Sequence, residues 1–166
     1  MVAQETLKKA SLAQKIGLDE KKVDEITNIS AHILADVQAL YIKTRGFHWN
    51  LEDPRFYFLH ELFNEHYEAL EEESDLIAER IRQIGRRAPG SFAEFKQLMS
   101  LKETSERLSG DEMIETLVGD YEYLIRNLRQ AIDHITNLED FGTADMFTQI
   151  IREFEKRAWM LRSHIV

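Results

Sequence analysis

The stretch GFHWNLEDPRFYFLHELFNEH, residues 46–66, joins two helical patterns through one proline and carries three of the chain's six histidines. Apolar residues recur at spacings of three and four on both sides of it, which is typical of amphipathic helices. We expect Asp53 to cap the second helix and Pro54 to take its first position, where a missing N–H is tolerated. His48 precedes Pro54 by six residues and His60 follows it by six. If these helices are antiparallel neighbours, the two histidines lie level with each other.

Four long helices are predicted from the apolar spacing along the whole chain. The first runs from about Lys22 to residues 48–50. The second begins at Pro54 and ends at Gly85, a residue type that commonly terminates helices. The third and fourth follow a long connection, and Thr143 is expected to cap the fourth.

The connection between the second and third helices spans about 25 residues, which is too long for a plain loop in a compact domain. Ser91 and Glu94 resemble a capping box, so a short helix is expected at 92–98. A second capping box, Ser109 with Glu112, marks the start of the third long helix. The sequence therefore predicts an all-α fold, a ferritin-like four-helix bundle with a short extra helix in the crossover between its second and third helices.

Composition favours one domain of this kind. The 166 residues include two prolines and seven glycines, few enough for long uninterrupted helices. Residues 1–21 show mixed charge and little periodicity, so we predict an N-terminal tail there and the bundle domain at 22–166. The absence of cysteine excludes disulfides and thiolate chemistry. No apolar run suits a signal peptide or a membrane span, so a cytoplasmic protein is expected.

The histidines and the acids of the second helix predict two half-sites for a metal ion. Fifteen residues separate His60 from Asp75, and at the rise of an α-helix this is about 22 Å, too far for one ion to contact both. His48 with His60 forms one half-site, and Asp75 with Glu79 forms the other. The halves complete each other if the helix packs antiparallel against its own copy on a two-fold axis, crossing near residues 69–70.

From these residues alone, a metal site competes with a structural explanation. Imidazole and carboxylate ligands suit iron, zinc or manganese, and a site with open positions fits redox iron better than a closed structural ion. Histidines on an apolar face are more often core residues than ligands, and paired acids usually form a solvated face, as expected for Glu71, Glu72 and Glu73. No glutamate lies three residues before a histidine, so the Glu-x-x-His pair of intrasubunit di-iron bundles is missing.

Four motifs carry a resemblance to a known family. They are GFHWN, the placement of His60 twelve residues after His48, DLIAERIRQIG at 75–85, and EKRAWMLRS at 155–163. Over roughly residues 22–163 the chain resembles the Dps proteins, mini-ferritins named as DNA-binding proteins from starved cells. The resemblance implies a dodecameric hollow shell that oxidises Fe(II) with hydrogen peroxide and stores ferric iron. It also implies ferroxidase sites between two-fold-related subunits.

Carried over to this sequence, the resemblance makes His48 and His60 the ligands from one subunit. It makes Asp75 and Glu79 the ligands from the other, in agreement with the helix-length estimate. Trp49 resembles the family tryptophan beside the site, where an aromatic ring could absorb stray oxidising equivalents. Simple packing explains Trp49 equally well.

One position departs from the family pattern. The residue four after His60 is usually an acid in the family, and here it is Asn64, which offers only a neutral carbonyl oxygen. We therefore expect the second iron position to be weaker, or to depend on water, Glu65 or His66. His66 points to roughly the opposite side of the helix, so a structural role is expected for it.

The resemblance also raises an iron entry pore and DNA binding. Asp140 and Asp145 flank the turn into the last helix, where the family builds an acidic three-fold pore, although a helix-start acid explains Asp145 equally well. Family DNA binding often depends on basic tails, whereas residues 1–25 hold five lysines and five acids. One alternative is a nucleoid-associated protein whose ferroxidase activity is impaired by Asn64. Another is a structural helical bundle with incidental histidines.

Overall fold

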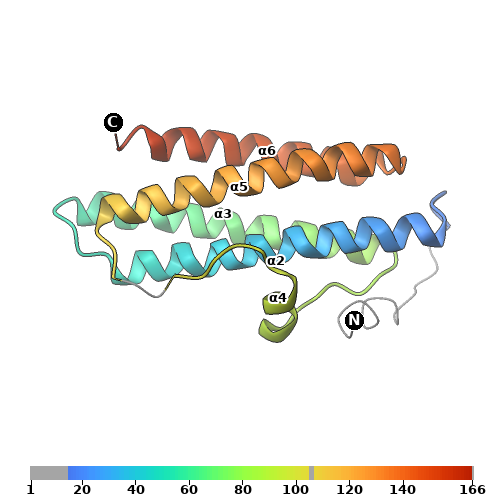
Figure 1. Ribbon diagram of the computed structural model, residues 1–166, viewed down its shortest axis with the longest axis horizontal. Helices are drawn as coiled ribbons and strands as arrows, with labels where there is room; N and C mark the ends of the chain where they lie inside the picture. The colour runs from blue at the N-terminus through green and yellow to red at the C-terminus, as the bar shows by residue number, and fades with distance from the viewer. Residues whose placement is uncertain (1–14, 105–106, 166) are drawn as a thin grey trace.

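The computed structural model describes residues 15–104 and 107–165, and in that part of the chain it contains helices and no strand. The helices are α2 (Glu20–Asn50), α3 (Phe56–Gln83), α4 (Phe92–Leu98), α5 (Gly110–Asn137) and α6 (Phe141–Arg162). Figure 1 shows the four long helices lying side by side, with α4 outside them. The predicted all-α bundle and its short crossover helix are confirmed.

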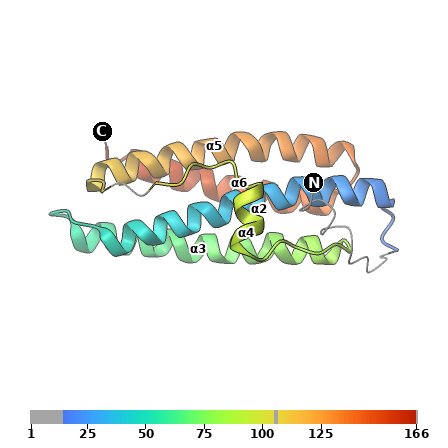
Figure 2. The same ribbon diagram turned by 60° about the horizontal axis from the view of Figure 1, so that its bottom comes forward.

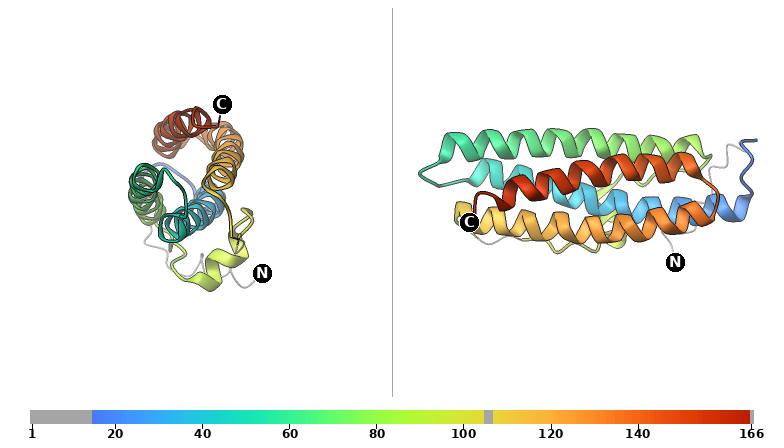
Figure 3. Two further views of the ribbon diagram at one scale, coloured as in Figure 1. Left: turned by 90° about the vertical axis from the view of Figure 1, so that its left-hand side faces the viewer. Right: turned by 90° about the horizontal axis from the view of Figure 1, so that it is seen from above.

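The bundle consists of two helix pairs. α2 packs along α3, α5 packs along α6, and α2 also contacts α5 and α4. The end-on view in Figure 3 shows the four long helices around a shared interior, with the short helix on the outer side of α2. Figure 2 shows α4 lying across α2 from outside. Among the described residues, no helix combines the length and the apolar character that a membrane crossing requires.

Apolar side chains from all four long helices fill the interior. The largest fully buried side chains include Phe63, Leu70, Tyr121, Phe147 and Phe154. Burying an apolar side chain of this size contributes about 1.5–3 kcal/mol relative to leaving it in water. The bundle interior is therefore the main source of the stability that holds the site residues in place.

The start of α3 differs from the prediction by two residues. The Asp53 carbonyl accepts the Phe56 N–H at 2.9 Å, and the Asp53 carboxylate accepts the Arg55 N–H at 2.7 Å. These bonds close a turn over residues 54–55, so the regular helix begins at Phe56 and the expected first position of Pro54 is wrong. Asp53 still satisfies an N–H at the helix entrance, which is the role of a cap.

The same turn packs closely against the start of α5. A Cβ atom at Gly110 would lie 2.3 Å from Oδ2 of Asp53 and 2.9 Å from a methyl group of Leu59. A Cβ atom here would force the side chain of Asp53 or Leu59 to shift, so the close contact favours glycine. The contact holds the α2–α3 turn, and the histidines beside it, in place against the second helix pair.

The crossover is fixed to α2 by a buried acid. Oδ1 of Asp36 accepts the N–H of Ser100 at 2.5 Å and of Leu101 at 2.8 Å. Burial raises the pKa of Asp36, and these two hydrogen bonds oppose the rise. α4 begins where predicted, with the Ser91 side chain accepting the Glu94 N–H.

The last two helices have the predicted positions, with one correction at a cap. Ser109 and Glu112 form the expected capping box of α5. Thr143 does not cap α6, because Oδ1 of Asp140 accepts the Thr143 N–H at 3.1 Å and Asp140 is the cap. Glu139 has a φ of 67°, a left-handed conformation that turns the chain back and leaves Asp140 at the helix entrance.

Candidate metal centre

The histidine pair, His48 and His60, lies where the last turn of α2 faces the first turns of α3. The two imidazole rings stack, with centroids 3.6 Å apart and an interplanar angle of 22°. Nδ1 of His48 lies 2.8 Å from the His60 carbonyl oxygen, and Nδ1 of His60 lies 3.1 Å from the His48 carbonyl oxygen. The prediction that the two residues come level across the turn is confirmed.

These two hydrogen bonds determine the tautomer of both rings. A carbonyl oxygen can only accept, so each Nδ1 must carry the hydrogen and donate it. In a neutral imidazole the lone pair is then on Nε2, which is the form that binds metal ions. A backbone carbonyl that receives the other ring N–H also fixes the ring orientation, as is usual for metal-binding histidines. The histidine pair therefore offers two adjacent nitrogen ligands.

Aromatic rings enclose the histidine pair. The Phe56 ring stacks on His60 at 4.9 Å, and the Tyr67 ring meets His48 edge-on at 5.3 Å. Both histidines are half-buried. The rings limit the directions from which water and ligands approach the imidazoles.

Asn64 is half-buried, and its carbonyl oxygen is already engaged. The Tyr67 hydroxyl donates to Oδ1 of Asn64 at 2.5 Å. This oxygen is the side-chain atom of Asn64 that could bind a cation, and the Tyr67 hydroxyl already engages one of its lone pairs. Glu65, the other nearby acid named from the sequence, is exposed.

Asp75 and Glu79 lie on exposed positions of α3, away from the histidine pair. The helix is unbroken from Phe56 to Gln83, so His60 and Asp75 stay about 22 Å apart along it. Within the described ranges, no group of three or more histidines and acids could hold a metal ion. Within one chain, the two predicted half-sites therefore lie apart.

Trp49 is largely exposed, with 66% of its surface accessible. Its ring contacts the Arg45 guanidinium, whose carbon lies 5.0 Å from the ring centroid. The same guanidinium lies 5.8 Å from the rings of both Tyr41 and Tyr67. Packing inside the chain therefore does not explain Trp49.

The two pore candidates differ in what they offer a cation. Asp140 is buried, caps α6, and accepts a hydrogen bond from Nη2 of Arg80 at 2.8 Å. Asp145 is exposed, and its carboxylate accepts a hydrogen bond from Gln149 at 2.8 Å. Of the two, Asp145 has the accessible charge that a pore lining requires.

A buried group that we name the core polar cluster lies in the bundle interior and consists of His66, Glu73, Tyr121 and Arg157. The Glu73 carboxylate and the Arg157 guanidinium form two hydrogen bonds of 2.8 Å each. The Tyr121 hydroxyl lies 3.2 Å from Nδ1 of His66. The structural role expected for His66 is confirmed by its burial.

Burial shifts the pKa values in the core polar cluster. It lowers the pKa of His66 to about 4, with a smaller contribution from the Arg157 charge. It raises the pKa of Tyr121 and of Glu73, and Arg157 opposes both rises. The expectation that Glu73 lies on a solvated face was wrong. Its spacing, three residues after Leu70, places it on the buried stripe and was the signal in the sequence.

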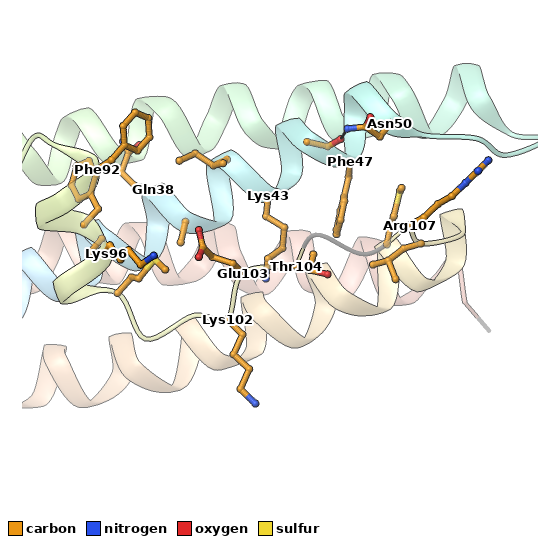
Figure 4. A pocket seen from close by; sticks show the side chains of 18 of the residues that line it. Gln38, Lys43, Phe47, Asn50, Phe92, Lys96, Lys102, Glu103, Thr104 and Arg107 are labelled. Carbon is orange, nitrogen blue, oxygen red and sulfur yellow. Dashed lines mark hydrogen bonds between the residues drawn. The ribbon is translucent and has the colours of Figure 1, made fainter.

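A pocket of about 690 Å³ lies between α2 and the crossover. Figure 4 shows Phe47, Lys43 and Phe92 among the side chains around it. None of the residues of the two half-sites lines this pocket. It is therefore separate from the candidate metal centre.

Comparison with known proteins agrees with this architecture. Residues 31–166 match the family model of the ferritin-like domain. A low temperature-induced protein of Nostoc is 43% identical over 152 residues, covering 90% of this chain and 85% of the relative. DNA protection during starvation protein 2 of Bacillus anthracis is 34% identical over 145 residues, covering 87% and 97%.

A solved structure supports the same conclusion. The crystal structure of the Dps protein of Vibrio cholerae, described as a ferritin-like diiron-carboxylate protein, superposes with a TM-score of 0.89 at 31% identity. The match covers 92% of this chain and 96% of that one. The fold and the matching family model define a ferritin-like protein. Within that class, the chain belongs to the Dps family of mini-ferritins.

Proposed function

We propose that this protein is a ferroxidase and iron store that oxidises Fe(II) with hydrogen peroxide at sites between two-fold-related subunits. The histidine pair carries the proposal, because its hydrogen bonds leave two adjacent Nε2 lone pairs, and among the described residues no group of three or more histidines and acids completes a metal site. The ferric product is held in a hollow shell, a dodecamer by analogy with the family. Removing Fe(II) and peroxide together protects DNA, as the names of the starvation-protection relatives suggest.

A second copy of α3 completes each site. With the helices antiparallel and crossing near residues 69–70, Asp75 and Glu79 of one subunit meet the histidine pair of the other, and the two-fold axis repeats the site. Two apolar side chains on α3 support such a contact, since Phe56 is 47% and Leu76 is 46% exposed in the single chain. Exposed apolar residues of this kind favour an assembled state.

The ligand set suits iron as the substrate. Two neutral imidazoles and two carboxylates form a mixed nitrogen and oxygen environment typical of redox-active iron. The carboxylates offset the positive charge that builds as Fe(II) becomes Fe(III). Zinc and manganese accept similar ligands, but the comparisons favour iron, because the relative of known structure is a member of a superfamily of ferritin-like diiron-carboxylate proteins.

Mixing two inactive variants tests the shared site. His60→Ala removes a ligand from one half-site and Asp75→Ala removes one from the other, so each variant alone should lose most peroxide-dependent Fe(II) oxidation. A co-assembled dimer of the two variants contains one doubly damaged site and one intact site. Activity should therefore return on co-assembly, which a site contained within one chain would not allow. Persistent inactivity of the correctly assembled mixture would overturn the proposal, and His134→Ala is the matched control histidine on α5.

We expect the second iron at each site to bind loosely. Asn64 has no negative charge, and its carbonyl oxygen already accepts the Tyr67 hydroxyl. Titration of the metal-free protein with Fe(II) without oxidant should show one tight ion per site. Asn64→Asp should raise the count toward two, because it adds a charged ligand. Two equally tight ions in the unmodified protein would contradict this expectation.

Iron entry is proposed at Asp145. Its exposed carboxylate near the start of α6 would form a ring around a three-fold axis and concentrate cations there. Asp140 is less suited, since Arg80 already neutralises it. Asp145→Asn should slow Fe(II) uptake at low ionic strength and leave binding at the histidine pair unchanged in equilibrium titrations.

DNA binding is a second proposal, and it is favoured by relatives that are named as DNA protection proteins. Such binding depends on neutralising phosphates, and the chain as a whole carries a net charge of −9. A gel shift with plasmid DNA at low salt measures it directly. Retardation together with absent peroxide-dependent oxidation would favour the nucleoid-associated alternative.

A further inference from the structure

Tyr67 contacts both Asn64, at the iron position expected to bind loosely, and His48, a proposed ligand of the tightly bound iron. Its hydroxyl donates to Oδ1 of Asn64 at 2.5 Å, and its ring meets the His48 ring edge-on at 5.3 Å. The residue is half-buried, and it comes from α3, the same helix as His60. An oxidisable side chain therefore lies in contact with a proposed iron ligand, where the family pattern would place a second charged ligand nearby.

Further aromatic residues continue from Tyr67 to the surface. The Tyr41 ring lies 6.1 Å from Tyr67, and the Arg45 guanidinium lies between 5.0 and 5.8 Å from the rings of Tyr41, Tyr67 and Trp49. Arg45 also donates to the Tyr41 hydroxyl at 2.7 Å. A fixed positive charge beside these rings disfavours a radical cation. It favours oxidation of a phenol in which the proton leaves with the electron.

The chemistry of peroxide creates a need for such a donor. Reduction of hydrogen peroxide to water takes two electrons, and one Fe(II) supplies one. A site with two tightly held Fe(II) ions supplies both electrons at once. A site with one tightly held Fe(II), as expected here because of Asn64, would give peroxide only one of the two electrons. One-electron reduction of peroxide releases hydroxyl radical.

We infer that Tyr67 supplies the second electron when one Fe(II) occupies the site, an inference that rests on the proposed ferroxidase function. The peroxide O–O bond breaks as Fe(II) gives one electron and the phenol gives one electron and its proton. One further proton comes from solvent. The products are Fe(III), a neutral tyrosyl radical and two waters. A later Fe(II) reduces the radical, and a solvent proton restores the phenol.

The hydrogen bond to Asn64 has a specific part in this step. An asparagine carbonyl is too weak a base to keep the phenolic proton, so it orients the hydroxyl and leaves the proton free to pass to the peroxide oxygen. An aspartate at this position would instead hold a second Fe(II). The electron from Tyr67 would then no longer be needed.

The test uses the assembled protein loaded with one Fe(II) per site and mixed with one equivalent of hydrogen peroxide. Freeze-quenched electron paramagnetic resonance should show a tyrosyl radical in the unmodified protein, with little hydroxyl radical captured by a spin trap. Tyr67→Phe keeps the ring and removes the hydroxyl. It should lose that signal and release several-fold more hydroxyl radical at the same loading of one Fe(II) per site, with a thermal midpoint lowered by about 2 °C or less.

Two controls separate this role from others. Tyr123→Phe on α5, a helix without half-site residues, should behave like the unmodified protein. In an Asn64→Asp background loaded with two Fe(II) per site, Tyr67→Phe should make no difference, since the second Fe(II) supplies the electron. If iron is oxidised but Tyr67→Phe leaves both the radical and the trapped hydroxyl radical unchanged, the inference fails alone. If peroxide oxidises no iron at the site, the proposed function fails with it.

Discussion

Two clusters that pair histidine with tyrosine lie along α3, and they use the same side-chain chemistry in opposite ways. At the start of the helix, the histidine pair is half-buried, and backbone carbonyls take both Nδ1–H groups. Further along, His66 is 4% exposed, and its partners all belong to the core polar cluster. The first cluster leaves its lone pairs available to a cation, whereas the second uses its polar atoms to connect three helices.

The distribution of charge supports the proposed placement of metal chemistry at the subunit boundary. Bundle proteins with intrasubunit sites hold their metals in the interior, on glutamate and histidine. Here Arg157 occupies that interior and pairs with Glu73, so a cation would meet a positive charge and a neutralised acid. In the part of the chain that the structure describes, the imidazoles of the histidine pair are hydrogen-bonded to backbone carbonyls and not to a cation, and the pair lies beside the proposed two-fold contact.

The largest effect is expected from removing the guanidinium of the core polar cluster. Arg157→Met leaves the Glu73 carboxylate buried without its partner, which should lower the free energy of unfolding by about 3–5 kcal/mol. Urea denaturation at fixed protein concentration measures the loss. The control is Arg129→Met, which breaks an exposed pair with Glu155 and should cost about 1 kcal/mol or less. Equal losses would mean that burial does not distinguish the two pairs.

The pH dependence of stability should come next in size, through His66. Burial holds its pKa at about 4 in the folded state, against about 6.5 in an unfolded chain. Between these two pKa values the unfolded state therefore binds more protons than the folded state. The contribution of neutral His66 to stability is fully present above pH 6.5 and is lost as the pH falls toward 4. The difference corresponds to about 3 kcal/mol.

His66→Gln should remove this part of the pH dependence. Denaturation series at pH 7 and pH 4.5 give the slope for each protein, and the variant's slope should be flatter. His134→Gln, which alters an exposed histidine paired with Glu25, should retain the slope of the unmodified protein. Parallel slopes in all three proteins would show that folding does not lower the pKa of His66.

Much of the fold could be predicted because it depends on local patterns. Apolar spacing and capping residues predicted the four long helices and the short helix at 92–98. The errors occurred where two candidates for one role stood close together. Asp140 replaced Thr143 as the cap of α6, because Glu139 adopts a left-handed conformation that no neighbouring sequence pattern requires.

The site could be predicted only as far as one chain and one helix determine it. The position of Pro54 between His48 and His60 was enough to bring the histidines together. The bond from Tyr67 to Asn64 was not predicted, because it depends on side-chain rotamers on adjacent turns. The pairing of Glu73 with Arg157 joins residues 84 positions apart, and only the packing of α3 against α6 determines it.

Within the histidine pair, losing a ring should affect metal binding more than stability. His48→Ala should weaken Fe(II) binding by at least about tenfold, since even residues that only support metal ligands contribute 10–100-fold. Equilibrium titration without oxidant provides the measurement. His32→Ala is the matched control, because His32 is also half-buried on α2 and its Nδ1 also contacts a backbone carbonyl, that of Asn28, at 2.8 Å. Comparable weakening in both variants would remove the distinction between the histidine pair and other half-buried histidines.

The smallest effect should appear in the stability of two tyrosine variants that each lose one hydroxyl. Tyr121→Phe leaves Nδ1 of the buried His66 without its partner and should cost about 1–3 kcal/mol, whereas Tyr67→Phe frees the half-buried Asn64 oxygen to bind water and should cost about 0.5 kcal/mol. Parallel urea denaturation of the two variants measures the difference directly. A larger loss for Tyr67→Phe would mean that the region of the histidine pair, and not the core polar cluster, depends on its tyrosine for folding.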